Sequence, residues 1–199
     1  GKNACIVTEH ADLEAAASGI VRSAFGLSGQ KCSALSRLYV HETVADDLLL
    51  LLKKKTAAIA IGDPSLRENW LGPVNNAAAY ADYQRYILLL AQAGAVLHTG
   101  GEYLTDGDKA RGYFVSPVIA EAEVSHPLWH REMFLPILMM HRFTSAQQAM
   151  DLANDSDVGL TAGFYGAADE VPWFQDHIEA GVTYANRAQG ATTGAWPGY

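Results

Sequence analysis

The chain has 199 residues and a formal net charge of −8, with 49% hydrophobic and 18% charged residues. This apolar content excludes an intrinsically disordered chain, and the length suffices for one domain with a sizeable core. Because phosphate binding needs a basic face, the acidic balance argues against nucleic acid as the main partner. Two cysteines are too few for a disulfide framework and suit a reducing compartment, and no apolar run is long enough for a membrane-spanning helix.

Strand and helix signals alternate along the chain. Apolar runs predict strands at residues 4–7, 37–40, 95–99, 114–119, 137–143, 161–165 and 182–185. Helical periodicity and capping residues predict helices at residues 13–24, 43–59, 76–93, 145–154 and 168–179. Strands separated by helices are typical of a largely parallel sheet, so we expect an α/β fold of three layers with helices on both faces.

Three residues predict where helices begin and end. Asp12 precedes the first helical stripe and is expected to cap it, and Ser145 with Gln148 forms a capping-box pattern. Gly94 follows the strongest helix at the place where a glycine commonly ends a helix.

Cys32 is the leading candidate for chemistry. It lies in a polar loop with glycines at positions 26 and 29, and Lys31 beside it favours the reactive thiolate. Local composition leaves the alternative open that Cys32 is a small buried residue, as free cysteines usually are. Cys5 lies inside an apolar strand, so we expect it to be buried and inert while Cys32 is accessible to solvent.

Patterns for cofactors and metals are weak when read alone. His126 and His130 have the spacing of zinc ligands, but Pro127 and the absence of a helical glutamate favour ordinary surface histidines, so no metal site is predicted. No glycine fingerprint for a dinucleotide follows a predicted strand. Glu132 and Phe134 precede a predicted strand, where composition alone favours a capping or surface glutamate.

The order and spacing of several segments are more informative than any one of them. Together they resemble the catalytic half of the aldehyde dehydrogenase superfamily over nearly the whole chain. These segments are residues 1–4, 29–32, 37–42, 132–136, 152–163 and 179–186. Within the superfamily, residues 30–33 and 186–195 are most similar to the 1-pyrroline-5-carboxylate (glutamate semialdehyde) dehydrogenases.

The resemblance implies a role for each matching residue. Cys32 matches the nucleophile whose thiolate attacks the aldehyde carbon, giving a thiohemiacetal and then a thioester that water hydrolyses. Glu132 matches the glutamate that binds the nicotinamide-side ribose, and Phe134 matches the aromatic residue beside it. The positions that anchor the far carboxylate of glutamate semialdehyde correspond to Ser33, Gly194 and Ala195.

The resemblance also implies parts that this sequence lacks. NAD or NADP would be bound mainly by a cofactor-binding domain that the chain does not contain, and the general-base glutamate and the oxyanion-hole asparagine are also missing. Leu135 stands where a glycine is common. We therefore expect residues 1–199 to be one catalytic domain excised from a longer enzyme, inactive alone and contacting its own cofactor domain. The full-length enzyme is expected to form a homo-oligomer that acts on a small aldehyde acid, in the bacterial cytoplasm or in the mitochondrial matrix of a eukaryote.

Two other functions remain open from the residues themselves. Cys32 could serve a thiol hydrolase or acyltransferase, which would need a histidine close to it in space. The chain could also be a non-catalytic interaction module of the same fold. Production of NADH that depends on Cys32 distinguishes the dehydrogenase from both.

Overall fold

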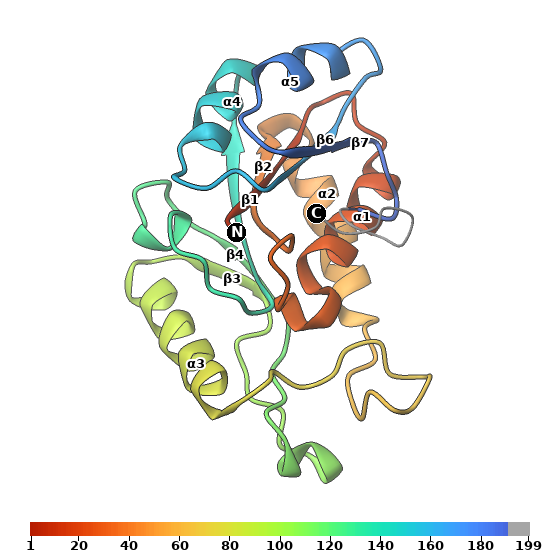
Figure 1. The fold of residues 1–199 in the computed structure, drawn as a ribbon, viewed down its shortest axis with the longest axis vertical. Coiled ribbons are helices and arrows are strands. Elements are labelled where there is room, and N and C mark those ends of the chain that lie inside the picture. The colour runs from red at the N-terminus through yellow and green to blue at the C-terminus, as the bar shows by residue number, and fades with distance from the viewer. Residues whose placement is uncertain (191–199) are drawn as a thin grey trace.

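The computed structural model describes residues 1–190, which form a seven-stranded sheet in the order β3-β4-β5-β2-β1-β6-β7 (Figure 1). Every neighbouring pair is parallel except β3 and β4, which are antiparallel. The expectation of a largely parallel sheet is therefore confirmed. The strands are β1 (Asn3–Val7), β2 (Leu35–His41), β3 (Val96–Thr99), β4 (Val118–Glu121), β5 (Ile137–Phe143), β6 (Thr161–Tyr165) and β7 (Val182–Ala185).

Helices cover both faces of this sheet, as the alternating pattern predicts (Figure 1). On one face α1 (Leu13–Phe25) and α2 (Glu42–Ala57) share a buried cluster with Cys5 and Val7 of β1. The other face is covered by α3 (Ala77–Gln92), α4 (Ala146–Asn154) and α5 (Val171–His177). Three short 3-10 turns complete the described elements: η1 (Gly26–Gly29), η2 (Gly107–Arg111) and η3 (Pro127–Trp129). Among residues 1–190, no helix is long and apolar enough to cross a membrane.

The helix-end signals are confirmed. The Asp12 carboxylate caps α1 by accepting the N–H of Glu14 at 3.0 Å. Ser145 caps α4 by accepting the N–H of Gln148 at 3.3 Å. Gly94 follows α3 with φ +78°, the left-handed conformation in which a glycine carries no steric penalty.

Two predicted elements are wrong in their bounds, and both begin later than expected, beside a proline. The strand expected at residues 114–119 begins only at Val118, because Pro117 lacks the N–H that a sheet ladder needs. The helix expected at residues 168–179 is shortened to α5, since Pro172 lies in its first turn, where proline is best tolerated.

A buried arginine connects β2 to α4 and to the start of β1. Arg37 is 2% exposed, and its guanidinium donates to the carbonyl oxygens of Ala153 at 2.9 Å and Leu152 at 3.1 Å. Its Nε also donates to the carbonyl oxygen of Lys2 at 2.9 Å. Because the last carbonyls of a helix have no partner within the helix, Arg37 satisfies the end of α4 and fixes the residues that enter β1.

Candidate active site

Four of the predicted site residues lie before the amino ends of neighbouring strands. Cys32 and Ser33 precede β2, while Glu132 and Phe134 precede β5. Since β2 and β5 are adjacent and parallel, the structure brings these residues to one edge of the sheet. Ligands of open parallel sheets usually bind at the opposite, carboxyl edge. Here α1 returns the chain to the amino edge, and the Cys32 loop follows that helix directly.

Glycines allow the segments at this edge to touch through their backbones. Gly29 has φ +68°, and a Cβ on it would overlap the carbonyl group of Leu135. A Cβ on Gly1 would overlap the carbonyl oxygen of Cys32. Gly29 thus permits close packing against another protein segment.

The two cysteines differ as predicted. Cys5 is fully buried, and burial raises the pKa of its thiol far above the ordinary range. Cys32 is exposed. Burial lowers the pKa of the neighbouring Lys31 ammonium, and the negative charge of a Cys32 thiolate partly offsets this.

The loop before Cys32 has a strained backbone that its surroundings hold in place. Leu27 and Ser28 both have positive φ angles, +56° and +57°. The hydroxyl of Ser28 donates to the carbonyl oxygen of Gly72 at 2.8 Å. The amide oxygen of Gln30 accepts the N–H of Asn75 at 2.8 Å. Strained backbone of this kind persists where neighbouring contacts determine it, and it is concentrated at functional sites.

Glu132 and Phe134 present their side chains to solvent at the same edge. The Glu132 side chain is 45% exposed and Phe134 is 44% exposed, with φ +55° at Phe134. Both line a small recess together with Gly1, Gly29 and Lys31. A carboxylate in this position can accept hydrogen bonds from hydroxyl groups, and the ring offers a flat apolar surface.

The remaining predicted positions are less informative. Ser33 is buried beside Cys32, with 4% of its surface exposed. Gly194 and Ala195 lie outside the described residues.

Sequence reasoning missed Lys2, which lies next to this site. The residue is only 1% exposed, and its Nζ has no hydrogen-bond partner within the described residues. Burial, together with the charge of Arg37, lowers the pKa of Lys2 to about 7, while Glu132 acts in the opposite direction. A lysine directly before an apolar strand was the available signal, because such a residue must either bend out to solvent or be buried.

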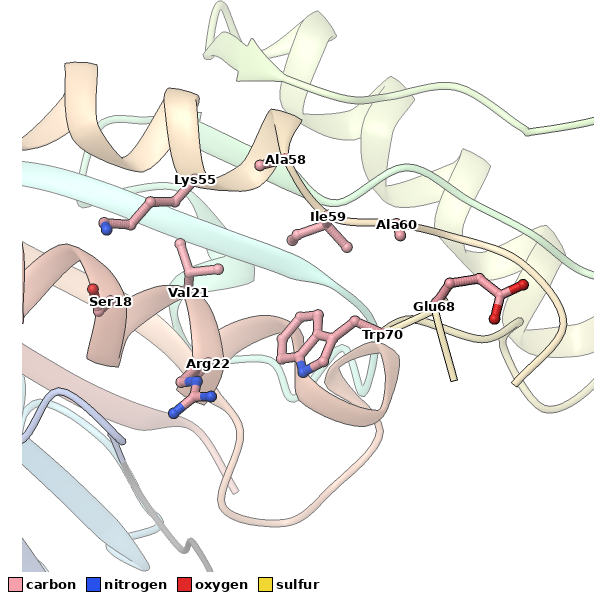
Figure 2. Close-up of a pocket in the computed structure, with 9 residues that line it drawn as sticks. All are labelled: Ser18, Val21, Arg22, Lys55, Ala58, Ile59, Ala60, Glu68 and Trp70. Atoms are coloured by element: carbon pink, nitrogen blue, oxygen red, sulfur yellow. The ribbon is translucent and has the colours of Figure 1, made fainter. Parts of the chain in front are cut away.

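A separate pocket of about 350 Å³ lies between α1 and the segment that follows α2 (Figure 2). Its lining includes Arg22, Lys55, Glu68 and the indole of Trp70. Lys55 also pairs with Glu14 at 2.5 Å. The pocket shares no lining residue with the recess beside Glu132, so the two are distinct features of the described surface.

The histidines of the described part have polar contacts away from Cys32. A thiol hydrolase would need one of them within hydrogen-bond reach of that thiol. His126 and His177 bond to backbone groups, and His141 packs edge-on against Trp129. The other pairs are His10–Glu170, His41–Thr43, His98–Glu121 and His130–Asp155. This arrangement gives no support to a cysteine–histidine pair. No group of three or more metal-ligating side chains occurs between residues 1 and 190.

Comparison with known proteins identifies the family. The sequence profile of the Aldehyde dehydrogenase family matches residues 1–199. The chain belongs to the aldehyde dehydrogenase family. It is 35% identical over 201 residues to a 1-pyrroline-5-carboxylate dehydrogenase of Bacillus mycoides (strain KBAB4). It is 37% identical over 203 residues to one of Geobacillus kaustophilus (strain HTA426). In each comparison all of this chain and 38% of the relative are covered.

Solved structures of the family show the same fold. A 1-pyrroline-5-carboxylate dehydrogenase from Thermus with bound NAD is 33% identical with a TM-score of 0.87, covering 94% of this chain and 36% of that one. Lactaldehyde dehydrogenase from Escherichia coli is 30% identical with a TM-score of 0.90, covering 98% and 40%. The chain therefore spans well under half the length of the aldehyde dehydrogenases it matches.

Proposed function

We propose that this chain is the catalytic segment of an NAD-dependent dehydrogenase that oxidises L-glutamate 5-semialdehyde to glutamate, with Cys32 as the nucleophile. The observation that carries the proposal is the placement of an exposed Cys32 at the same sheet edge as exposed Glu132 and Phe134. The similarity to 1-pyrroline-5-carboxylate dehydrogenases supports the choice of substrate.

Cys32 performs the covalent part of the reaction. Its thiolate adds to the aldehyde carbon, and the backbone N–H of Cys32 donates to the oxygen on which negative charge develops. Loss of a hydride from the aldehyde-derived carbon and of the proton from its hydroxyl would convert this adduct to a thioester on Cys32. Water then attacks the thioester, which releases the acid and regenerates the thiol.

Glu132 and Phe134 fit one end of a nicotinamide dinucleotide. The exposed Glu132 carboxylate can accept hydrogen bonds from ribose hydroxyls, and the exposed Phe134 ring can lie against a flat ring system. When bound, NAD supplies the hydride acceptor that the oxidation requires. We propose that the contacts to the rest of the cofactor come from polypeptide outside this chain, which spans 38% of its relatives. Those contacts would also decide between NAD and NADP.

The far carboxylate of the substrate requires hydrogen-bond donors at a fixed distance from Cys32. We propose that Ser33 supplies a hydroxyl and that the backbone at Gly194 and Ala195 supplies N–H groups. Hydrogen bonds to a carboxylate are charge-assisted and therefore among the strong ones, so these three positions would select an aldehyde that carries an acid group.

The test uses the complete polypeptide that carries this chain, supplied with glutamate semialdehyde and NAD. We expect NADH to form, Cys32→Ala to abolish its formation, and Cys5→Ala to retain it as the matched control. NADH formation that persists in Cys32→Ala would overturn the role of the thiol. Hydrolysis of thioesters without any NADH formation in the parent protein would instead favour a thiol hydrolase or acyltransferase.

A further inference from the structure

Asn3 is a buried residue that makes three hydrogen bonds at the start of β1. The residue is 3% exposed. Its amide nitrogen donates to the carbonyl oxygens of Cys32 and Ala34, both at 2.8 Å. Its amide oxygen accepts the N–H of Thr161 at 3.0 Å. Both amide hydrogens are therefore used, and one side chain connects β1, the Cys32 loop and the first residue of β6.

These bonds occur where the ladder between β1 and β2 is irregular. Asn3 is opposite Leu35, but the next residue, Ala4, is opposite Arg37, so the register shifts by one residue between them. A bulge leaves a residue of one strand out of the regular pairing. The carboxamide of Asn3 supplies hydrogen bonds on the loop side of this bulge, and they hold the chain between Cys32 and β2.

The bonds fix the backbone of Cys32 and leave its side chain free. The Cys32 carbonyl oxygen is held by Asn3 on one side and is packed against Gly1 on another. As a residue, Cys32 is exposed and forms no disulfide. The Cα of Cys32 is bonded to the carbonyl carbon, the backbone nitrogen and Cβ, so holding the carbonyl limits where the N–H and Cβ can lie.

We propose that Asn3 is a positioning residue that sets the orientation of Cys32, so that its thiol and its backbone N–H meet the aldehyde together. This role rests on the proposed function, in which Cys32 is the nucleophile. Asn3 does not touch substrate, and it acts only through the backbone of Cys32. Misplacement of a reacting group by about 1 Å can cost about 100-fold in rate, so the geometry of one peptide group suffices for a large effect.

The sharpest variant is Asn3→Asp, which has nearly the same shape. The carboxylate keeps an acceptor for the Thr161 N–H but has no hydrogen to donate to the carbonyl oxygens of Cys32 and Ala34. In Asn3→Ser the side chain is too short to reach these two carbonyl oxygens, and no charge is placed in the interior. Should Asn3→Asp fail to fold, Asn3→Ser provides the same comparison.

Asn154 offers a matched control. It is also a bridging asparagine, which donates to the carbonyl oxygen of His177 at 2.8 Å and accepts the N–H of Glu179 at 2.9 Å. Asn154→Asp therefore removes the same kind of bond from a region that does not contact Cys32.

The experiment measures kcat and KM for glutamate semialdehyde in the complete polypeptide, and the pH profile of Cys32 alkylation by iodoacetamide. For a folded Asn3 variant we expect kcat to fall about 100-fold with KM changed less than about threefold. We also expect alkylation to become faster across this pH range, because a released loop exposes the thiol further to the reagent. Asn154→Asp should change neither quantity.

Two outcomes overturn the proposal: an unchanged kcat in a folded Asn3 variant, or an alkylation profile equal to that of Asn154→Asp. Alkylation does not depend on aldehyde oxidation. An absence of NADH in the parent protein would contradict the proposed function, while a shifted alkylation profile would still support the control of Cys32 by Asn3.

Discussion

The hydroxyl of Tyr165 donates a hydrogen bond to the carbonyl oxygen of Arg187 at 2.8 Å, and both groups lie against Gly19 of α1. A Cβ on Gly19 would overlap both of these oxygen atoms. Gly190, with φ +69°, packs against Gly19 and Ser23 in the same way. Residues 187–190, which precede Gly194 and Ala195 in the sequence, therefore pack against α1. This helix ends just before the Cys32 loop (Figure 1).

Gly19→Ala is expected to weaken recognition of the substrate carboxylate. The added methyl group must displace the 187–190 segment, which precedes the proposed donors Gly194 and Ala195 in the sequence. We expect KM for glutamate semialdehyde to rise about tenfold, which corresponds to a loss of about 1.4 kcal/mol of binding. The measurement compares this substrate with propionaldehyde, whose KM should change little because it has no carboxylate.

Gly181→Ala is the matched control for that substitution. The nearest atom to a Cβ on Gly181 lies 3.6 Å away, so alanine fits there without any displacement. If Gly19→Ala raised KM equally for both aldehydes, a specific role of residues 187–190 in carboxylate recognition would be contradicted.

Alkylation of the native protein should distinguish the two cysteines. Iodoacetamide is expected to modify Cys32, which is exposed, and to leave Cys5 unmodified, since burial both blocks access and raises the pKa of its thiol. Mass spectrometry of peptides after a short reaction in buffer should find one modified cysteine, and the same reaction in concentrated urea should find both. Modification of Cys5 before Cys32 in buffer would show that the first strand opens more readily than the loop.

The parts of the fold that the sequence predicted are those specified by local chemistry. Asp12 marks the start of a helix because its side chain accepts backbone N–H groups. Gly94 marks the end of a helix because, without a Cβ, it adopts the left-handed conformation at no steric cost. The bounds near Pro117 and Pro172 were wrong, because apolar composition was weighted above the backbone constraint of proline. The order of the strands depends on which segments meet in space, and no local pattern contains that information.

In the candidate site, too, local signals could be read from the sequence, and contacts between distant segments could not. Cys32 could be found because a polar, glycine-containing loop with a lysine is a local signal for a reactive thiol. The contributions of Asn3 and Arg37 depend on partners far along the chain, such as Thr161 and Ala153. An asparagine or arginine beside an apolar strand does not reveal its partner until the strands are placed next to each other.

Arg37→Met is expected to destabilise the protein by about 2–4 kcal/mol. Methionine is apolar and of similar length, so it fills much of the space but leaves the carbonyl oxygens of Ala153 and Lys2 without their donor. A buried acceptor without a partner costs about 1–3 kcal/mol. The measurement is the free energy of unfolding in urea. Arg85→Met is the control, because the ion pair of Arg85 with Asp82 is exposed and should contribute no more than about 1 kcal/mol.

Lys2→Met is expected to stabilise the protein at neutral pH and to lose this advantage in alkaline solution. The pKa of Lys2 is lowered from 10.5 to about 7 in the folded protein by burial and by Arg37. Below pH 7 the lysine is charged in both the folded and the unfolded states, so folding carries the full cost of burying the charge. Between pH 7 and about 10 the unfolded state binds more protons than the folded state, and the stability of the parent protein therefore rises with pH. At about 1.4 kcal/mol for each pKa unit, the cost is on the order of 5 kcal/mol.

The advantage of Lys2→Met in unfolding free energy should therefore be largest at pH 6–7 and smallest near pH 10. Urea unfolding at several pH values measures it, with Lys54→Met at an exposed position as the control whose difference from the parent should not depend on pH. If the difference between Lys2→Met and the parent were the same at pH 7 and pH 10, the ammonium of Lys2 would already be compensated in the folded protein. The carboxylate of Glu132, whose charge opposes the shift, would be the first partner to test, by adding Glu132→Gln to both proteins.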